Sequence, residues 1–171
     1  MCILIVKPAG AQMPPKDIIH LCEKHNPDGF GYATRYETFK TMDRKEFERR
    51  LYSIPDDEPA IIHCRWATNG SIKESNCHPF FDKATGVAYA HNGVLSIPCG
   101  RDMTDSETAF RRFFVPAIKR YGLYSVQLQR VVERLIGYSK FAFIDSDGGL
   151  KTFGRFTEFE GCYYSNLRFI Y

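Results

Sequence analysis

The sequence begins Met1-Cys2-Ile3-Leu4-Ile5-Val6, with a cysteine directly after the methionine and a run of four apolar residues behind it. If Met1 is removed, Cys2 carries both a thiol and a free α-amine. The unperturbed pKa values of these groups are about 8.5 and about 7.7 to 8.0, so they can exchange a proton during attack on a carbonyl. The alternative is an ordinary small residue that opens a buried strand, and the other motifs of the chain decide between the two.

The composition is that of one globular domain, which we assign to residues 1–171. Apolar residues make up 44% and charged residues 25% of the chain. A chain of this length buries about 70% of the surface that it exposes when unfolded. The net charge of +3 is too small to indicate a nucleic-acid or membrane partner, so we expect neither.

No apolar run is long enough for a transmembrane helix, and the N-terminus lacks the features of a signal peptide, so we expect a cytoplasmic protein. None of the six cysteines forms a C-x-x-C pair. Most should be buried thiols in a reducing compartment. The pairs His63-Cys64 and Cys77-His78 could converge on a metal, but adjacent residues of a strand point to opposite faces. We therefore expect neither a metal nor a cofactor.

Short apolar runs and helical patterns alternate along the chain. We expect strands at 3–6, 60–64, 87–90, 141–144 and 150–153, and helices at 16–25, 43–54, 105–121 and 125–136. Asp43 and Glu46 have the spacing of a capping box, and Pro116 should interrupt the third helix. The last residues, 161–171, are interpreted as a terminal strand and loop.

Four polar motifs follow Cys2, and two of them come directly after predicted strands. They are Arg65-Trp66-Ala67-Thr68-Asn69-Gly70, Asn76-Cys77-His78-Pro79, His91-Asn92-Gly93 and Asp105-Ser106-Glu107. In this order behind a cysteine at position 2, they resemble the class II glutamine amidotransferase domain, a family of N-terminal-nucleophile hydrolases. Asp28-Gly29-Phe30-Gly31 is similar to the early glycine-containing turn of that family. The resemblance runs from residue 2 to about residue 110.

This resemblance implies an α+β fold, a four-layer αββα sandwich in which helices cover both outer faces of two stacked sheets. It also implies that Cys2 attacks the side-chain amide of glutamine. Ammonia is then released, and water hydrolyses the remaining γ-glutamyl thioester to glutamate. The α-amine of Cys2 is expected to accept the proton of the thiol.

By resemblance, the side-chain amide of Asn92 and the backbone N–H of Gly93 stabilise the tetrahedral oxyanion. Taken alone, the pair Asn92-Gly93 is typical of a two-residue hairpin turn. The resemblance reads His78 and His91 as buried structural or supporting histidines, because the α-amine already fills the role of the base.

Free glutamine carries two charges that the resemblance assigns to two side chains. Arg65 would bind the carboxylate and Asp105 the ammonium group. The ordinary interpretations are a surface salt bridge for Arg65 and a helix cap for Asp105. Trp66, Thr68 and Asn69 would line the pocket, although a single tryptophan is more often found in a core.

Three residues depart from the family pattern. Ile3 stands where many members have glycine, Asn69 where many have histidine, and Cys77 where alanine is frequent. Asn69 can form hydrogen bonds but cannot titrate. Ile3 would crowd the nucleophile, which raises the question of an altered substrate or a weak catalyst.

The favoured function is therefore a stand-alone glutamine hydrolase that supplies ammonia to a separate synthase or transferase. A second interpretation is hydrolysis of another amide by the same nucleophile, and loss of the Arg65 and Asp105 charge pair would support it. A third is a binding or regulatory module without turnover, which Ile3 and Asn69 motivate.

Overall fold

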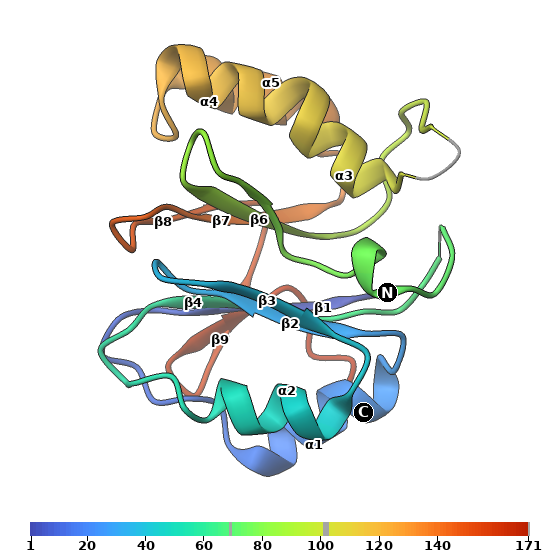
Figure 1. Cartoon of the computed structure of the whole chain (residues 1–171), viewed down its shortest axis with the longest axis vertical. Helices are drawn as coiled ribbons and strands as arrows, with labels where there is room; N and C mark the ends of the chain where they lie inside the picture. Colours follow the sequence, from blue (N-terminus) through green and yellow to red (C-terminus); the bar gives the residue numbers. More distant parts are fainter. Residues whose placement is uncertain (69, 101–102, 171) are drawn as a thin grey trace.

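The computed structural model describes residues 1–68, 70–100 and 103–170. Two antiparallel sheets are stacked face to face, and a layer of helices covers the outer face of each (Figure 1). This arrangement is the predicted four-layer αββα sandwich. The N-terminus lies near the plane between the sheets, so the first residues of the chain can reach the space that separates them.

The first sheet contains β1, the strand that follows Cys2, and has the order β3-β2-β4-β1-β10-β9 within the described residues. Its strands are β1 (Ile3–Lys7), β2 (Phe30–Ala33), β3 (Thr38–Thr41), β4 (Ala60–Cys64), β9 (Thr157–Phe159) and β10 (Cys162–Tyr164). The helices α1 (Lys16–His25) and α2 (Arg44–Leu51) cover its outer face (Figure 1). β1 pairs with β4 from Ile3↔Cys64 to Lys7↔Ala60, which brings Cys2 next to the loop after β4.

The second sheet has the order β5-β6-β7-β8. It comprises β5 (Phe80–Asp82), β6 (Val87–Asn92), β7 (Lys140–Ile144) and β8 (Leu150–Phe153). Its outer helices are α3 (Asp105–Ala109), the π-helical turn η2 (Phe110–Phe114), α4 (Val115–Tyr121) and α5 (Val126–Leu135), and a short 3-10 turn, η1 (Glu74–Asn76), precedes β5. No helix within the described ranges is both long and apolar enough to cross a bilayer.

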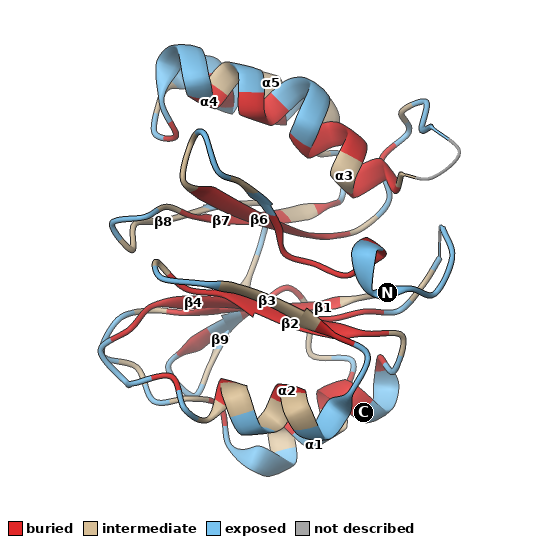
Figure 2. Cartoon of the chain, viewed as in Figure 1, coloured by how far each residue is buried: buried red, intermediate tan, exposed pale blue. Residues whose placement is uncertain are grey.

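Alternation along β1 divides its side chains between two cores. Ile3 and Ile5 pack into the core beneath α1 and α2, whereas Leu4 and Val6 pack into the core between the two sheets. Successive side chains of a strand point to opposite faces, so Cys2 belongs to the face that is turned toward the second sheet. The central strands on both sides of this interface, β1 and β4 in the first sheet and β6 and most of β7 in the second, are buried (Figure 2).

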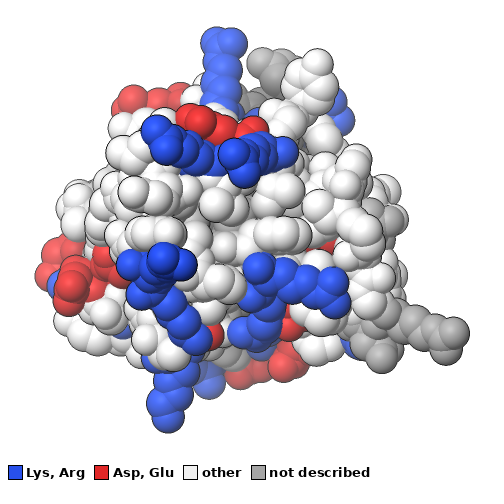
Figure 3. Space-filling view, turned by 90° about the horizontal axis from the view of Figure 1, so that it is seen from above, with Lys and Arg blue, Asp and Glu red and all other residues white. Residues whose placement is uncertain are grey.

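Charged side chains lie on the outer surface of the helical layers. Figure 3 views the face that carries α4 and α5, and the basic side chains visible on it form separate groups with uncharged or acidic side chains between them. The helical segments of this layer carry the basic residues Arg111, Arg112, Lys119, Arg120, Arg130 and Arg134.

The helix starting after Asp43 shows half of the predicted capping box. The Asp43 side chain accepts hydrogen bonds from the backbone N–H groups of Lys45 and Glu46, at 2.8 and 3.1 Å. The reciprocal half is wrong, because the Glu46 carboxylate binds Arg50 and the Asp43 N–H donates to Thr41 Oγ1. A single side-chain cap is thus sufficient to start α2.

Candidate active site

Segments that are distant in the sequence meet in a small cavity of about 20 Å³ between the ends of β1, β4 and β6, and this cavity is open to solvent. Eight of the residues predicted from the sequence line it: Cys2, Arg65, Trp66, Thr68, His78, His91, Gly93 and Asp105. Asn92 is buried beside Gly93 without lining the cavity, and Asn69 lies outside the described residues. The lining residues Ala67, Asn76, Thr104 and Ser106 belong to the predicted motifs or their borders but had no predicted role.

The Cys2 thiol is held against the backbone of Trp66. Its Sγ atom lies 3.5 Å from the Trp66 carbonyl oxygen, to which it donates, and 3.4 Å from the Trp66 nitrogen, from which it accepts. Burial raises the pKa of the Cys2 thiol, and the Trp66 hydrogen bond, the N-terminal charge and Arg65 offset this in part. The thiol is therefore protonated at neutral pH and needs a base before it can attack.

Both residues at the N-terminus are fixed through their carbonyl groups. Asn26 Nδ2 donates to the Met1 oxygen at 2.9 Å, and Asn166 Nδ2 donates to the Cys2 oxygen at 3.0 Å. Ile3 is 1% exposed in the core beneath α1 and α2, and it does not line the cavity. Its bulk is thus directed away from the thiol.

Asp28 and Gly29 contact the loop after β4, which carries Arg65, Trp66 and Thr68. Asp28 Oδ2 accepts from the Ala67 N–H at 2.8 Å, and the Asp28 N–H donates to the Arg65 oxygen at 3.0 Å. The Arg65 N–H donates to the Gly29 oxygen at 2.8 Å. Gly29 has φ +127°, and a Cβ there would lie 2.2 Å from Cys77 Sγ, so only glycine fits. The sequence showed a glycine-containing turn here but gave no sign of its contact with this loop.

Arg65 and Trp66 have environments that differ from the ordinary interpretations. Arg65 is 3% exposed, so it does not form a surface salt bridge, and its Nη1 donates to the Ser71 oxygen at 3.3 Å. Trp66 is 47% exposed at the cavity and is not a core residue. The neighbouring Thr68 is also exposed.

Asn92 and Gly93 end a strand and do not form a hairpin turn. β6 continues to Asn92, which pairs with Lys140 of β7. Gly93 has φ +143°, and a Cβ there would lie 2.9 Å from the Ser139 Cα. The tight contact with Ser139 and the unusual φ together require glycine at this position, which leaves its backbone close to the cavity.

Ser165, after β10, holds the Asn92 side chain and was not predicted from the sequence. Asn92 Nδ2 donates to Ser165 Oγ at 2.8 Å, and the same oxygen accepts from the Leu4 N–H at 2.9 Å. Asn92 Oδ1 is buried without a hydrogen-bond partner among the described residues. Ser165 therefore links β1, which follows the nucleophile, to the end of β6.

Asp105 is the first residue of α3, and Thr104 caps that helix. Thr104 Oγ1 accepts from the Glu107 N–H at 3.1 Å, so the helix-cap interpretation of Asp105 is wrong. Asp105 is 6% exposed, lines the cavity, and accepts from the Leu95 N–H through Oδ2 at 2.7 Å.

Three buried histidines lie at the cavity: His78 and His91 line it, and the His63 ring contacts that of His78. The ring centroids of His63 and His78 are 4.3 Å apart, and those of His78 and His91 are 6.3 Å apart. Burial lowers the pKa of His63 and of His91 to about 3, and it holds the pKa of His78 well below its usual range. All three are neutral at pH 7. His91 Nδ1 is 2.7 Å from Ser106 Oγ, and His63 Nε2 is 3.0 Å from the His91 oxygen.

Comparison with known proteins gives consistent results. The family model described as glutamine amidotransferases class-II matches residues 50–150. Glutamine–fructose-6-phosphate aminotransferase of Mesorhizobium japonicum is 35% identical over an alignment of 103 positions, which covers 56% of this chain and 17% of that protein. The enzyme of the same name from Leifsonia xyli is 34% identical over an alignment of 122 positions, which covers 65% of this chain and 20% of that protein.

A solved structure confirms the fold. Glutamine phosphoribosylpyrophosphate amidotransferase from B. subtilis superimposes with a TM-score of 0.57 at 17% identity, covering 96% of this chain and 41% of that chain. The sequence matches span a fifth or less of the length of the curated relatives, as the shares of 17% and 20% show.

Proposed function

Since this chain belongs to the class II glutamine amidotransferases, a family of enzymes, we propose that it hydrolyses the side-chain amide of glutamine to glutamate and ammonia, with Cys2 as the nucleophile. The observation that carries this proposal is the cavity in which the Cys2 thiol, Arg65 and Asp105 meet. A thiol and two opposite charges are what a free amino acid with a reactive side-chain amide requires.

The nucleophile is activated by its own α-amine. Burial raises the pKa of the Cys2 thiol, so the thiolate must form during the reaction, as a neighbouring base takes the proton. While Met1 is attached, the Cys2 nitrogen is an amide and has no basicity. Removal of Met1, whose side chain and backbone are 48% exposed, converts this nitrogen into an amine.

The first step makes the Cys2 Sγ–carbon bond and moves the thiol proton to the α-amine. The charge on the former carbonyl oxygen is stabilised by the Gly93 N–H and the Asn92 amide. Rotation of the Asn92 side-chain amide exchanges the positions of its oxygen and nitrogen. The hydrogen bond with Ser165 is kept, because a hydroxyl can donate to Oδ1 as well as accept from Nδ2. In this orientation the buried NH2 group takes the place of the unpartnered oxygen and can donate a hydrogen bond to the oxyanion.

The second step breaks the bond between carbon and nitrogen. The amide nitrogen leaves as ammonia with the proton held by the α-amine, and a γ-glutamyl thioester remains on Cys2. Water adds to this thioester, the α-amine again takes and returns one proton, and glutamate leaves with the thiol restored.

The substrate is free glutamine, because its two charged ends match two buried side chains. Arg65 is 3% exposed and Asp105 is 6% exposed, and burial makes each charge costly unless a ligand or a neighbour compensates it. Arg65 binds the carboxylate and Asp105 the ammonium, while Trp66 and Thr68 line the pocket beside them. Both charged side chains lie at the same cavity as the Cys2 thiol, which favours free glutamine over an amide that lacks these two charged groups.

The ammonia is consumed by a separate synthase or transferase, and residues 1–171 act as a single domain. We also place the protein in the cytoplasm, because all six cysteines are free thiols, as a reducing compartment favours.

Glutamate release from glutamine by the untagged protein tests the proposal. Cys2→Ala should reduce release to the background rate, whereas Cys99→Ala should retain the full rate, because Cys99 is an exposed thiol outside the cavity. Release that survives in Cys2→Ala would exclude Cys2 as the nucleophile. A Met1-free protein that releases no glutamate would support the binding-module interpretation instead.

A further inference from the structure

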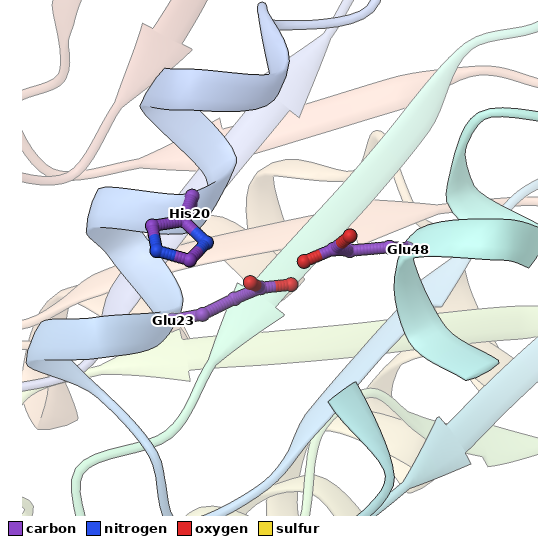
Figure 4. A group of neighbouring side chains, drawn as sticks. All are labelled: His20, Glu23 and Glu48. Atoms are coloured by element: carbon purple, nitrogen blue, oxygen red, sulfur yellow. The ribbon is translucent and has the colours of Figure 1, made fainter. Parts of the chain in front are cut away.

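Three ionisable side chains gather on the helical layer outside the first sheet, away from the glutamine cavity. His20 and Glu23 lie on α1 with a spacing of three residues, and Glu48 lies on α2. One ligand atom from each lies within 4.8 Å of the other two. Figure 4 shows the Glu23 and Glu48 carboxylates facing each other across the gap between the helices, with the His20 ring beside them.

The Glu23 carboxylate indicates that this cluster has an incomplete set of partners. Its side chain is 0% exposed, and neither oxygen has a hydrogen-bond partner among the described residues. A buried carboxylate without a full set of partners is costly, and a bound cation is one of the arrangements that compensates it.

One protein cation already touches the cluster. Arg44 Nε lies 3.5 Å from Glu23 Oε2 and 3.5 Å from Glu48 Oε1, distances longer than those of a well-formed charged hydrogen bond. The Arg44 side chain is 47% exposed, so it can turn into solvent without crossing packed side chains.

We propose that His20, Glu23 and Glu48 bind one divalent transition-metal ion of the zinc type, which joins α1 to α2. One imidazole nitrogen and two carboxylate oxygens are a common protein donor set for Zn²⁺, with a solvent molecule as the fourth ligand. Zinc–ligand distances of about 2.0 to 2.2 Å require the donors to approach one another, and exposed His20 and part-exposed Glu48 have the freedom to do so.

The proposed metal site lies away from the cavity that contains Cys2, so its role is structural. α1 and α2 cover the outer face of the first sheet, whereas Cys2 lies on the face toward the second sheet (Figure 1). An ion here fixes the packing of two helices without contact with glutamine, and it displaces Arg44 from both glutamates. The ion is therefore independent of the hydrolytic mechanism proposed above.

The test measures Zn²⁺ binding by calorimetry on the untagged full chain with Cys2→Ala and Cys99→Ala, which remove the accessible thiols. We expect one ion per chain. His20→Ala and Glu48→Gln should each weaken binding about tenfold or more, since loss of a residue that only supports a ligand already costs about 10- to 100-fold. The matched controls His25→Ala on α1 and Glu46→Gln on α2 should leave the affinity unchanged.

Two further readouts separate this site from other sources of binding. Co²⁺ in the same protein should give a visible d–d spectrum without a thiolate charge-transfer band. Arg44→Gln should tighten Zn²⁺ binding, because the competing guanidinium is gone. Circular dichroism should show that the surface variants fold. The absence of saturable Zn²⁺ binding, equal affinities for His20→Ala and His25→Ala, or a thiolate band would overturn the proposal.

Discussion

Cys2 is the proposed nucleophile, and removal of Met1 would give the same residue a free α-amine as proton acceptor. Its thiol is partly buried, and burial raises the pKa of this thiol, so it stays protonated at neutral pH until a base takes the proton. The sequence predicted this residue and its neighbours in the cavity because the motifs occur together in the order of the family that they resemble; each motif alone favoured an ordinary structural interpretation. It could not predict Asp28 and Ser165, because their roles depend on contacts with distant loops that no local pattern records.

Replacement of Asn92 tests the oxyanion stabilisation. Asn92→Ala should lower kcat by about 10²- to 10³-fold, or about 2.7 to 4 kcal/mol, because one donor to the developing charge is lost. KM for glutamine should change little, since the charge that Asn92 stabilises develops only in the transition state. Steady-state glutaminase kinetics provide the measurement, and a raised KM at unchanged kcat would contradict the role.

Replacement of Ser165 tests whether it acts through Asn92. Ser165→Ala removes the hydroxyl that holds the Asn92 amide and the Leu4 N–H, so kcat should fall, by less than in Asn92→Ala. In the double variant, Ser165→Ala should cause no further loss of kcat, because the group that it positions is already absent. Additive losses in this double-mutant cycle would show an independent role.

At the scale of elements, long apolar runs were predictable and short paired segments were not. β1 and β4 are buried along their whole length and appear in the sequence as continuous apolar runs. β3 and β9 have only four and three residues, with polar side chains among them, and they exist because neighbouring strands supply their hydrogen bonds. The start of β2 shows how tightly these pairings are packed.

Gly31 in β2 should not tolerate a side chain. A Cβ there would lie 2.2 Å from the His78 oxygen and 2.6 Å from the Phe39 oxygen, and both are backbone atoms that cannot move independently. Gly31→Ala should therefore lower the free energy of unfolding by about 2 kcal/mol or more. Gly100→Ala is the matched control, because nothing lies within 4 Å of its added Cβ. Equal urea midpoints for the two variants would contradict this packing.

At the scale of the whole molecule, three neutral histidines are buried where the two sheets meet at the cavity. Their neutrality is a condition of the stacked fold, because a charged imidazole there would be buried without a counter-ion. The motifs predicted that His78 and His91 would be buried. The sequence offered His63-Cys64 and Cys77-His78 only as pairs that could converge on a metal. The contact between the His63 and His78 rings results from the stacking of the two sheets.

These histidines should make stability depend on pH. Their pKa values are lower in the folded state, about 3 for His63 and His91, than the ordinary value of about 6.5 when unfolded. Between these values the unfolded state binds more protons, so the free energy of unfolding rises with pH. Above about pH 6.5, the contribution of these neutral histidines to the free energy of unfolding is fully present. This contribution is lost as pH falls toward 3, with a slope of up to about 1.4 kcal/mol per pH unit for each histidine.

Urea unfolding across this pH range provides the measurement. His63→Gln should reduce the slope between about pH 6 and about pH 4 by roughly one proton, whereas His25→Ala, an exposed site, should leave it unchanged. An unaltered slope in His63→Gln would mean that His63 does not contribute to acid sensitivity.

The central claim concerns one atom, the thiol sulfur of an N-terminal Cys2, and covalent capture tests it most directly. Intact mass of the untagged protein should show that Met1 is absent. Treatment with a glutamine analogue that carries an electrophilic ketone in place of the amide should then add one label, on the peptide that begins with Cys2, and excess glutamine should prevent it. Retention of Met1, or a label on another thiol such as the exposed Cys99, would contradict the mechanism.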